Sequence, residues 1–192
     1  MTDTAIPRLR EAVRRTGELT RDRTPTGRRP GDADVHDGTF ATDGAIGFDP
    51  LPFLRALQEA GSGAVVVGQV AGIMHGSVEP TGDLDLLWDG TPAEARALRA
   101  ALTAAGCAEP PDLGRPVGSY RVAGASGDLC TPAVPWGGLD TAACLGRALT
   151  ATDAAGLTVR YVALDDLIRM RRALGRPKDH RRADELELLR GA

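Results

Sequence analysis

The sequence predicts a small mixed α/β fold, of the α+β kind, with a helical C-terminal segment. Three observations support this prediction. Short apolar runs alternate with stretches whose apolar residues recur at helical spacing. Glycine and proline stand where those stretches begin and end. Two helical patterns follow each other at the C-terminal end, and 192 residues suffice for one core with a small appendage.

The N-terminal 48 residues are predicted to form an arm or linker. Residues 6–19 fit one short amphipathic helix with Ile6 and Leu9 on the same side. Residues 20–48 are rich in Thr, Gly, Pro and charge, which is typical of a linker or a poorly ordered arm. We therefore expect a partly disordered arm at 1–48, a core at 49–150, and a strand with packed helices at 151–192.

Strands and helices are expected to alternate after this arm. Asp49 and Pro50 predict an N-cap followed by proline at the first helical position, and Gly61 predicts the end of that helix. The expected order is helix 51–61, strand 64–67, helix 69–76, strand 83–88, helix 92–105, loop 109–118, strands 119–122 and 127–131, loop 132–138, helix 139–149, strand 157–162, and helices 164–174 and 177–189.

Composition excludes several classes of protein. The chain is 42% hydrophobic and 26% charged, and it has no apolar stretch near the ~18 residues that a membrane span needs. Its first twenty residues lack the apolar region of a signal peptide, so a cytoplasmic location is expected. A structural zinc site is not predicted, because Cys107, Cys130 and Cys144 are widely spaced and form no C-x-x-C motif.

Basic residues gather at both ends of the chain. Residues 1–30 hold eight arginines against four acids, and residues 160–192 hold eight arginines and Lys178 against six acids. Such ends suit a polyanionic substrate, although ordinary solvated helix faces explain the charge equally well. Of 23 basic residues, only Lys178 is lysine, which makes it a functional candidate.

The most informative segment runs from residue 68 to residue 85. A strand carries its side chains with period two, so Asp83 and Asp85 are predicted on one face, where two carboxylates suit a hard divalent cation. Gly68 and Gln69 follow an apolar strand, at a turn whose free N–H groups attract anions. Asp128 on a later strand would complete the carboxylate set. The alternative is that these aspartates only form turns.

This pattern suits nucleotidyl transfer, which needs a triphosphate cradle and one or two metal ions held by carboxylates. It resembles the nucleotidyltransferase superfamily, the fold shared by polymerase β and many small bacterial transferases. The closer resemblance, over residues 50–190, is to the minimal bacterial branch related to abortive-infection and toxin–antitoxin transferases. The matching motifs are Gly68-Gln69-Val70-Ala71, His75-Gly76, Thr81-Gly82-Asp83-Leu84-Asp85, the later Asp128, Asp166-Leu167-Ile168, Arg171, and Gly175-Arg176-Pro177-Lys178-Asp179.

The resemblance implies a Mg²⁺- or Mn²⁺-dependent enzyme that moves a nucleoside monophosphate from an NTP to a hydroxyl acceptor on tRNA or protein. The same resemblance suggests an antitoxin partner, while the lack of a long apolar stretch predicts no membrane association. Asp83, Asp85 and Asp128 would be the catalytic metal ligands, with Asp128 also the general base. The residues expected to bind the nucleotide are Gly68, Gln69, Arg171 and Lys178.

Two alternatives remain open. A small-molecule transferase of the antibiotic-modifying kind would use the same carboxylates, and extra acids in its pocket would favour it. A catalytically silent binding or regulatory module is the other alternative, because Gln69 stands where the phosphate turn prefers glycine or serine. His75 is interpreted as a packing residue at a helix end, and Trp88 and Trp136 as core or pocket-rim residues.

Overall fold

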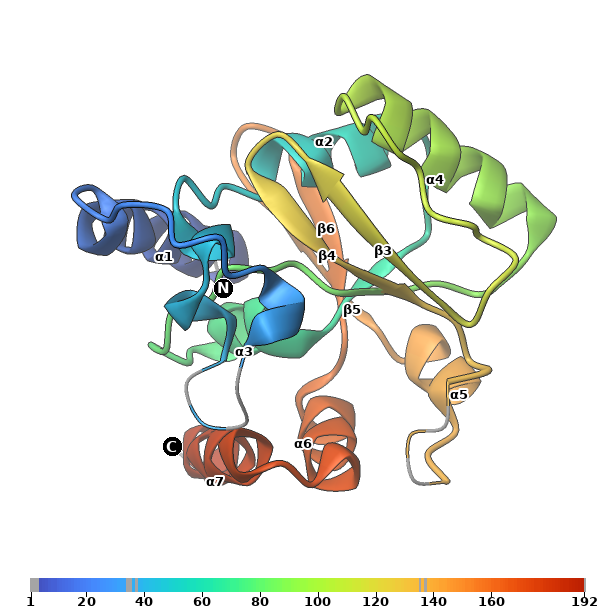
Figure 1. Cartoon of the computed structure of the whole chain (residues 1–192). Helices are drawn as coiled ribbons and strands as arrows, with labels where there is room; N and C mark the ends of the chain where they lie inside the picture. The colour runs from blue at the N-terminus through green and yellow to red at the C-terminus, as the bar shows by residue number, and fades with distance from the viewer. Residues whose placement is uncertain (1–3, 34–35, 37, 135, 137, 192) are drawn as a thin grey trace.

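The computed structural model describes residues 4–33, 36, 38–134, 136 and 138–191. Within these residues a six-stranded mixed sheet runs in the order β3-β4-β2-β1-β6-β5, which confirms the mixed α/β prediction (Figure 1). The strands are β1 (Val65–Val66), β2 (Leu86–Leu87), β3 (Val117–Val122), β4 (Ala125–Cys130), β5 (Leu149–Thr152) and β6 (Thr158–Tyr161).

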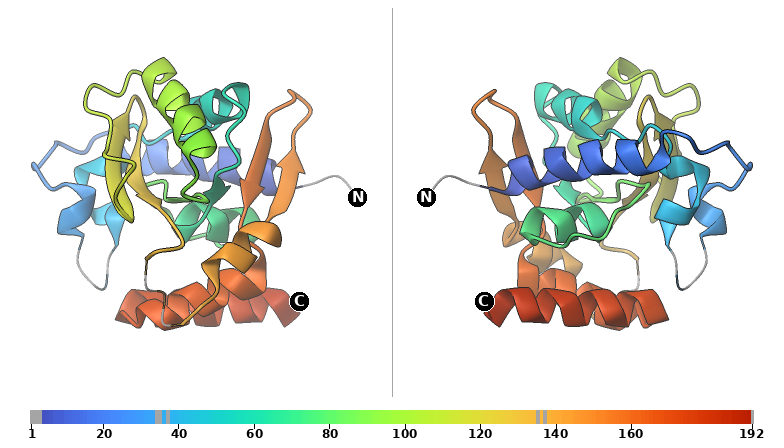
Figure 2. Two further views of the ribbon diagram at one scale, coloured as in Figure 1. Left: turned by 90° about the vertical axis from the view of Figure 1, so that its right-hand side faces the viewer. Right: turned by 90° about the vertical axis from the view of Figure 1, so that its left-hand side faces the viewer.

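Helices cover both faces of this sheet. Helices α2 and α4 lie on one face, α1 and α3 lie on the other, and α6 with α7 forms a layer at one end (Figures 1 and 2). No described helix is both long and apolar enough to cross a membrane. The α-helices are α1 (Ala5–Thr20), α2 (Leu51–Glu59), α3 (Gly68–His75), α4 (Pro92–Ala104), α5 (Thr141–Gly146), α6 (Leu164–Leu174) and α7 (Pro177–Gly191), and the 3₁₀ helices are η1 (Pro30–Asp32), η2 (Thr39–Ala41) and η3 (Asp43–Ala45).

The centre of the sheet joins segments that are distant in sequence. Strand β1 pairs antiparallel with β2 and parallel with β6, and β2 pairs parallel with β4. Backbone pairing continues beyond the short β2, since the Val67 N–H donates to the Asp85 carbonyl at 2.9 Å and the Leu84 N–H donates to the Ser126 carbonyl at 2.9 Å. Residues 84 and 85 are therefore held from both sides.

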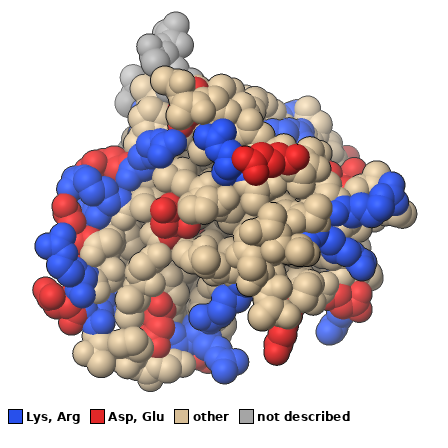
Figure 3. All heavy atoms as spheres, turned by 90° about the horizontal axis from the view of Figure 1, so that it is seen from above, with Lys and Arg blue, Asp and Glu red and all other residues tan. Residues whose placement is uncertain are grey.

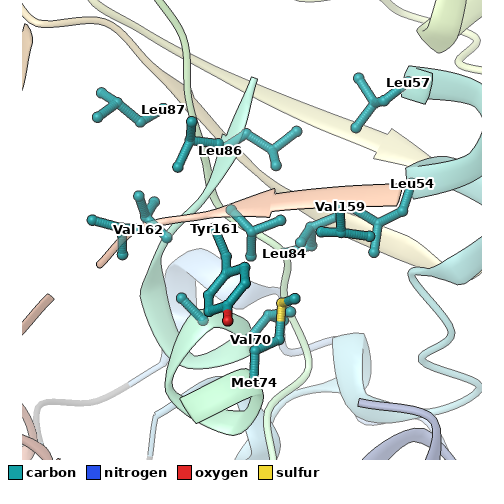
Figure 4. Close-up of a cluster of buried hydrophobic side chains, with 14 of the residues drawn as sticks. Leu54, Leu57, Val70, Met74, Leu84, Leu86, Leu87, Val159, Tyr161 and Val162 are labelled. Atoms are coloured by element: carbon teal, nitrogen blue, oxygen red, sulfur yellow. The ribbon is translucent and has the colours of Figure 1, made fainter. Parts of the chain in front are cut away.

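One hydrophobic core unites the sheet with its helices (Figure 4). Leu84 and Leu86 are buried, and Leu84 lies next to Val70 and Met74 of α3. Each such side chain contributes about 1.5–3 kcal/mol when it is removed from water. The core therefore fixes the strand that carries the candidate carboxylates.

The N-terminal region packs on this core, in contrast to the expected arm. Ile6 and Leu9 of α1 are 1% and 0% exposed, and α1 lies along α3. The predicted linker contains the short 3₁₀ helices η1, η2 and η3. Side chains such as Thr42 and Asp43 accept hydrogen bonds from its backbone N–H groups and so help to order it. Positions 34, 35 and 37 of that linker lie outside the described residues.

A second difference concerns the segment predicted as helix 139–149. The helix α5 is shorter, and β5 follows it as an edge strand paired antiparallel with β6. The short sequence Leu149–Thr152 has too few residues to display a strand period, so only its pairing with β6 identifies it. The preceding loop 132–138 includes positions 135 and 137, which lie outside the described residues.

Candidate active site

The predicted site residues share one cleft of about 1220 Å³. It is bounded by the ends of the central strands, by helices α6 and α7, and by residues 29–33 with Thr39 from the N-terminal region. All of the predicted residues line it: Gly68, Gln69, Asp83, Asp85, Asp128, Arg171 and Lys178. The structure therefore brings together residues that are up to 110 positions apart in the sequence.

Asp83 and Asp85 precede the observed strand β2 (Leu86–Leu87), which is shorter than the predicted strand 83–88. Both carboxylates line the cleft, whereas Leu84 and Leu86 are buried on the opposite side. Asp83 Oδ1 accepts hydrogen bonds from two threonine hydroxyls, Thr81 at 2.6 Å and Thr39 at 2.7 Å. This carboxylate is therefore held in one orientation.

Asp128 reaches the same cleft from the neighbouring strand β4. Its backbone N–H donates to Asp85 Oδ1 at 3.1 Å, and its own Oδ1 accepts from the Ser119 hydroxyl at 2.6 Å. The close approach needs glycine at position 127, because a Cβ there would meet the Leu84 carbonyl. The Tyr120 hydroxyl donates to that same carbonyl at 2.7 Å and fixes the strand from the other side.

The cluster concentrates negative charge. Burial raises the pKa of Asp85 well above its usual range, and the neighbouring charges of Asp83 and Asp128 raise it further. Burial, with the same acidic surroundings, raises the pKa of the Cys130 thiol to about 12. The cleft therefore favours a ligand that brings positive charge to its acidic end.

The donor chemistry of this cluster suits Mg²⁺ or Mn²⁺, since hard cations take carboxylate oxygens. Among the described residues, however, no three His, Cys, Asp or Glu side chains already converge as a cation site. Asp85 Oδ1 and Asp128 Oδ1 are engaged by the hydrogen bonds given above. The residue types therefore fit the ion. In this structure, the side chains are oriented by their hydrogen bonds and do not converge on one point.

Gly68 forms the turn between β1 and α3, as predicted. Its φ is +64°, and a Cβ at this position would lie 2.7 Å from Asp85 Oδ2. A side chain would be strained there and would also push against the carboxylate. The first N–H groups of α3, which lack partners within the helix, thus begin directly beside Asp85.

Gln69 has a structural contact set that sequence reasoning did not anticipate. Its side chain is 5% exposed, and its Nε2 donates to Ser77 Oγ at 3.0 Å and to the Glu79 carbonyl at 2.9 Å. Its Oε1 accepts from Arg171 at 2.8 Å. The hydrogen-bonding groups of the Gln69 amide are thus engaged by Ser77, Glu79 and Arg171, so the side chain does not crowd the phosphate turn.

Arg171 is a buried connector between the turn and the C-terminal helices. Its Nη2 donates to the Gly68 carbonyl at 3.0 Å and to Gln69, and its Nη1 lies 3.7 Å from Asp179 Oδ1. Burial lowers the pKa of Arg171 to about 10, with Arg182 lowering it further and Asp179 opposing that effect. The guanidinium stays charged at neutral pH, and its Nε has no hydrogen-bond partner among the described residues.

Lys178 lies at the start of α7 and is 6% exposed. Burial lowers its pKa, and the charges of Arg176 and Arg182 lower it further, while Asp179 and Asp83 oppose the change. Lys178 and Arg176 both line the cleft. The helical side of the cleft is therefore basic, and the sheet side is acidic.

Sequence reasoning assigned no role in the site to three hydroxyl residues: Thr39, Thr81 and Ser119. A signal existed for Thr81, which belongs to the Thr-x-Asp-x-Asp motif, and for Ser119, which stands opposite Asp128 in the β3–β4 register. Thr39 had none, because it contacts a residue 44 positions away from within a predicted linker. Hydroxyl donors thus support two of the three carboxylates.

His75 is a packing residue, in agreement with its interpretation. Its Nε2 lies 2.8 Å from the Val162 carbonyl, and its ring lies 5.0 Å from that of Tyr161. Burial lowers its pKa. Among the tryptophans, Trp88 is 2% exposed in the core, whereas Trp136 lines the cleft.

Comparison with known proteins adds no family to these observations. The chain matches no family model, and no curated protein is significantly similar to it in sequence.

Proposed function

We propose that this chain is a Mg²⁺- or Mn²⁺-dependent nucleotidyltransferase, which moves a nucleoside monophosphate from an NTP to a hydroxyl acceptor. One observation carries the proposal. Asp83, Asp85 and Asp128 line one cleft, and the glycine turn at Gly68 packs directly against one of these carboxylates. The negative charge of a triphosphate suits the N–H groups at the turn, and the divalent cation that accompanies it suits the carboxylates.

The acidic residues and the turn have distinct roles in this proposal. A bound divalent cation would supply charge neutralisation for the phosphates. The N–H groups at the start of α3 bind phosphate oxygens beside Gly68. Lys178, on the opposite side of the cleft, adds positive charge toward the remaining phosphates, whereas Arg176 is paired with Asp179.

Asp128 is the residue proposed to act as general base. Ser119 holds its carboxylate through the 2.6 Å hydrogen bond, and the side chain is half-buried at the cleft. The acceptor hydroxyl gives its proton to Asp128, and its oxygen forms a bond to the α-phosphorus. The bond from that phosphorus to the bridging oxygen breaks, and pyrophosphate leaves.

The acceptor is the open part of the proposal. Toxin-like resemblance points to tRNA or a protein side chain, and Arg29 and Arg121 among the lining residues suit a polyanion. The face shown in Figure 3 carries both signs of charge interspersed. Asp32 and Glu109 also line the cleft, and they favour the small-molecule alternative, in which a cationic acceptor occupies the cleft.

The silent-module alternative rested on Gln69, and that support is weaker now. The side chain of Gln69 is bonded to Ser77, Glu79 and Arg171 rather than placed across the turn. The space beside the turn is therefore left to a ligand.

Transfer of label tests the proposal. The purified chain is incubated with Mg²⁺ or Mn²⁺ and each α-labelled NTP, with tRNA, with protein acceptors including itself, or with an aminoglycoside. We expect label on one acceptor class, reduced about a hundredfold or more in Asp85→Asn. Asp89→Asn is the control, since Asp89 is exposed and outside the cleft.

Label that persists in Asp85→Asn contradicts the assigned site. Absence of label on every acceptor, together with absence of NTP binding, removes both enzyme alternatives. Label on the aminoglycoside alone selects the small-molecule alternative.

A further inference from the structure

The N-terminal region outside the resemblance contacts a candidate catalytic carboxylate directly. The Thr39 hydroxyl donates to Asp83 Oδ1 at 2.7 Å, and Thr39 Oγ1 lies 2.9 Å from Thr81 Oγ1. Both threonines are buried, and the Gly82 N–H donates to Thr39 Oγ1 at 3.2 Å. Asp83 is thus held partly by its own loop and partly by a distant segment.

Proton counting shows how Thr39 and Thr81 share Asp83. Each hydroxyl has one proton, so the two cannot donate both to Asp83 and to each other. Either both hydroxyls donate to Asp83 Oδ1, or one hydroxyl donates to Asp83 Oδ1 and accepts a hydrogen bond from the other hydroxyl. In both arrangements Thr39 belongs to the hydrogen-bonded unit that orients the carboxylate.

The described residues 28–33 and 38–45 are here named the N-terminal wall. This wall packs closely against the backbone at Gly82, next to Asp83. A Cβ on Gly82 would lie 2.5 Å from the Ala45 N and 2.8 Å from the Thr39 carbonyl oxygen. A Cβ on Gly44 would lie 2.6 Å from the Gly82 carbonyl oxygen. Glycine on both sides lets two backbones touch beside Asp83.

The N-terminal wall is anchored away from the cleft by its own contacts. Arg23 donates to the Phe40 carbonyl at 2.7 Å and lies over the Phe40 ring at 5.5 Å. Asp43 accepts from the Thr26 N–H at 2.9 Å and from the Gly27 N–H at 2.6 Å. Thr42 is fully buried and donates to the Thr39 carbonyl at 2.7 Å. These contacts place Thr39 independently of Asp83.

We propose that Thr39 is a positioning residue for Asp83, and that the N-terminal wall is a built part of the active site. This inference rests on the proposed function for the role of Asp83. Supporting residues that orient a ligating side chain affect metal affinity and activity strongly, although they do not touch the substrate. Thr39 meets that description through a hydroxyl, so the hydroxyl itself is the feature to remove.

The wild type and three full-length variants test the role of Thr39. Thr39→Val removes the hydroxyl at nearly constant shape, and Thr39→Ser restores it. Thr16→Val is the control, because Thr16 is 2% exposed on α1 and lies outside the cleft. The measurements on each chain are kcat and KM for label transfer, Mn²⁺ affinity without nucleotide, and the unfolding temperature.

We expect Thr39→Val to lower kcat and Mn²⁺ affinity by about 10–100-fold, with little change in KM for the NTP. Thr39→Ser should remain near wild type, and Thr16→Val should match wild type in both measurements. Unfolding temperatures of the two valine variants should agree within a few degrees, about 2–4 °C. A serine variant as impaired as the valine variant would overturn the assignment, as would an unimpaired Thr39→Val.

The wall itself is tested with two glycine substitutions. Gly44→Ala places a methyl group against the Gly82 carbonyl, whereas Gly17→Ala on α1 has no atom within 4 Å of its new Cβ. Faster amide exchange over residues 39–45 and weaker Mn²⁺ binding are expected only in Gly44→Ala. Unchanged exchange and binding in Gly44→Ala would show that the wall is not part of the site.

Wild-type behaviour separates this inference from the proposed function. A wild type that transfers label, together with an unaffected Thr39→Val, removes the positioning role alone. A wild type that neither binds Mn²⁺ nor transfers label removes the proposed function and this inference with it.

Discussion

The sheet side and the helical side of the cleft differ in how their charges are compensated. On the sheet side, Asp85 has like-charged neighbours in Asp83 and Asp128, which raise its pKa beyond the effect of burial. On the helical side, Arg171 already has Asp179 close to it and Arg182 is paired with Glu79. A bound cation would therefore compensate the charges of the three carboxylates, whereas Arg171 and Arg182 form ion pairs within the protein.

This comparison changes the role expected for Arg171. The resemblance implied nucleotide binding, yet its guanidinium donates to the Gly68 carbonyl and to Gln69. A buried charge with these partners stabilises the turn that the phosphates are proposed to meet. Lys178 lines the cleft at the start of α7 and remains the residue proposed to meet a phosphate, whereas Arg176 is paired with Asp179.

The largest expected effect is on stability. Arg171→Met leaves the Gly68 carbonyl and the Gln69 Oε1 without their charged donor, although Asp179 keeps Arg176 as a partner, so we expect a loss of about 3–5 kcal/mol in the free energy of unfolding. Urea denaturation measures it. Arg169→Met, at a side chain that is 63% exposed, should change the same quantity by no more than about 0.5 kcal/mol. A loss in Arg171→Met as small as in the control would contradict the connector role.

Gly68→Ala is expected to rank second. It combines a positive φ with a contact against Asp85 Oδ2, and we expect a loss of about 2–4 kcal/mol together with loss of NTP binding. Gly61→Ala is matched in φ, at +70°, but its Cβ would meet nothing within 4 Å. Its loss should be about 1–2 kcal/mol, with NTP binding retained. Equal losses would mean that the contact with Asp85 is unimportant.

Gln69→Gly installs the glycine that the resemblance prefers. Because the Gln69 amide bonds Ser77, Glu79 and Arg171, we expect about 2 kcal/mol of destabilisation and no gain in label transfer. Arg99→Gly, at an exposed position inside α4, should cost about 1 kcal/mol through helix propensity. Faster transfer at unchanged stability would instead show that Gln69 obstructs the turn.

The pH dependence of stability follows from the raised pKa of Asp85. A carboxyl that holds its proton more strongly when folded makes the folded state bind more protons than the unfolded chain, so stability falls as pH rises from about 4 through the folded pKa. Asp85→Asn removes that loss. Denaturation at a series of pH values should show the variant gaining stability relative to wild type as pH rises, and a constant difference between the two would contradict this expectation.

The sequence predicted the acidic side of the cleft well because local rules govern it. A period of two places Asp83 and Asp85 together, and the apolar runs around them mark the strands. The glycine at position 68 marks the turn for the same kind of reason, since its φ is +64°.

The rest of the site depends on contacts that local patterns do not record. Thr39 reaches Asp83 across 44 positions from a segment without periodicity, and Gln69 is satisfied by residues on a distant helix and loop. Its loop-like composition made the N-terminal region look like a linker, although buried threonines and side-chain caps order it. Composition identifies segments that lack long helices and strands, but it does not distinguish a segment that packs on the core from a flexible linker.

Calorimetric titration of the full chain with a non-hydrolysable NTP, with and without Mn²⁺, tests the central claim without any acceptor. The account predicts NTP binding that requires Mn²⁺, is lost in Asp85→Asn and is retained in Asp89→Asn. Binding that is independent of Mn²⁺, or equal in the two variants, would contradict the claim that the three carboxylates receive a metal-bound nucleotide.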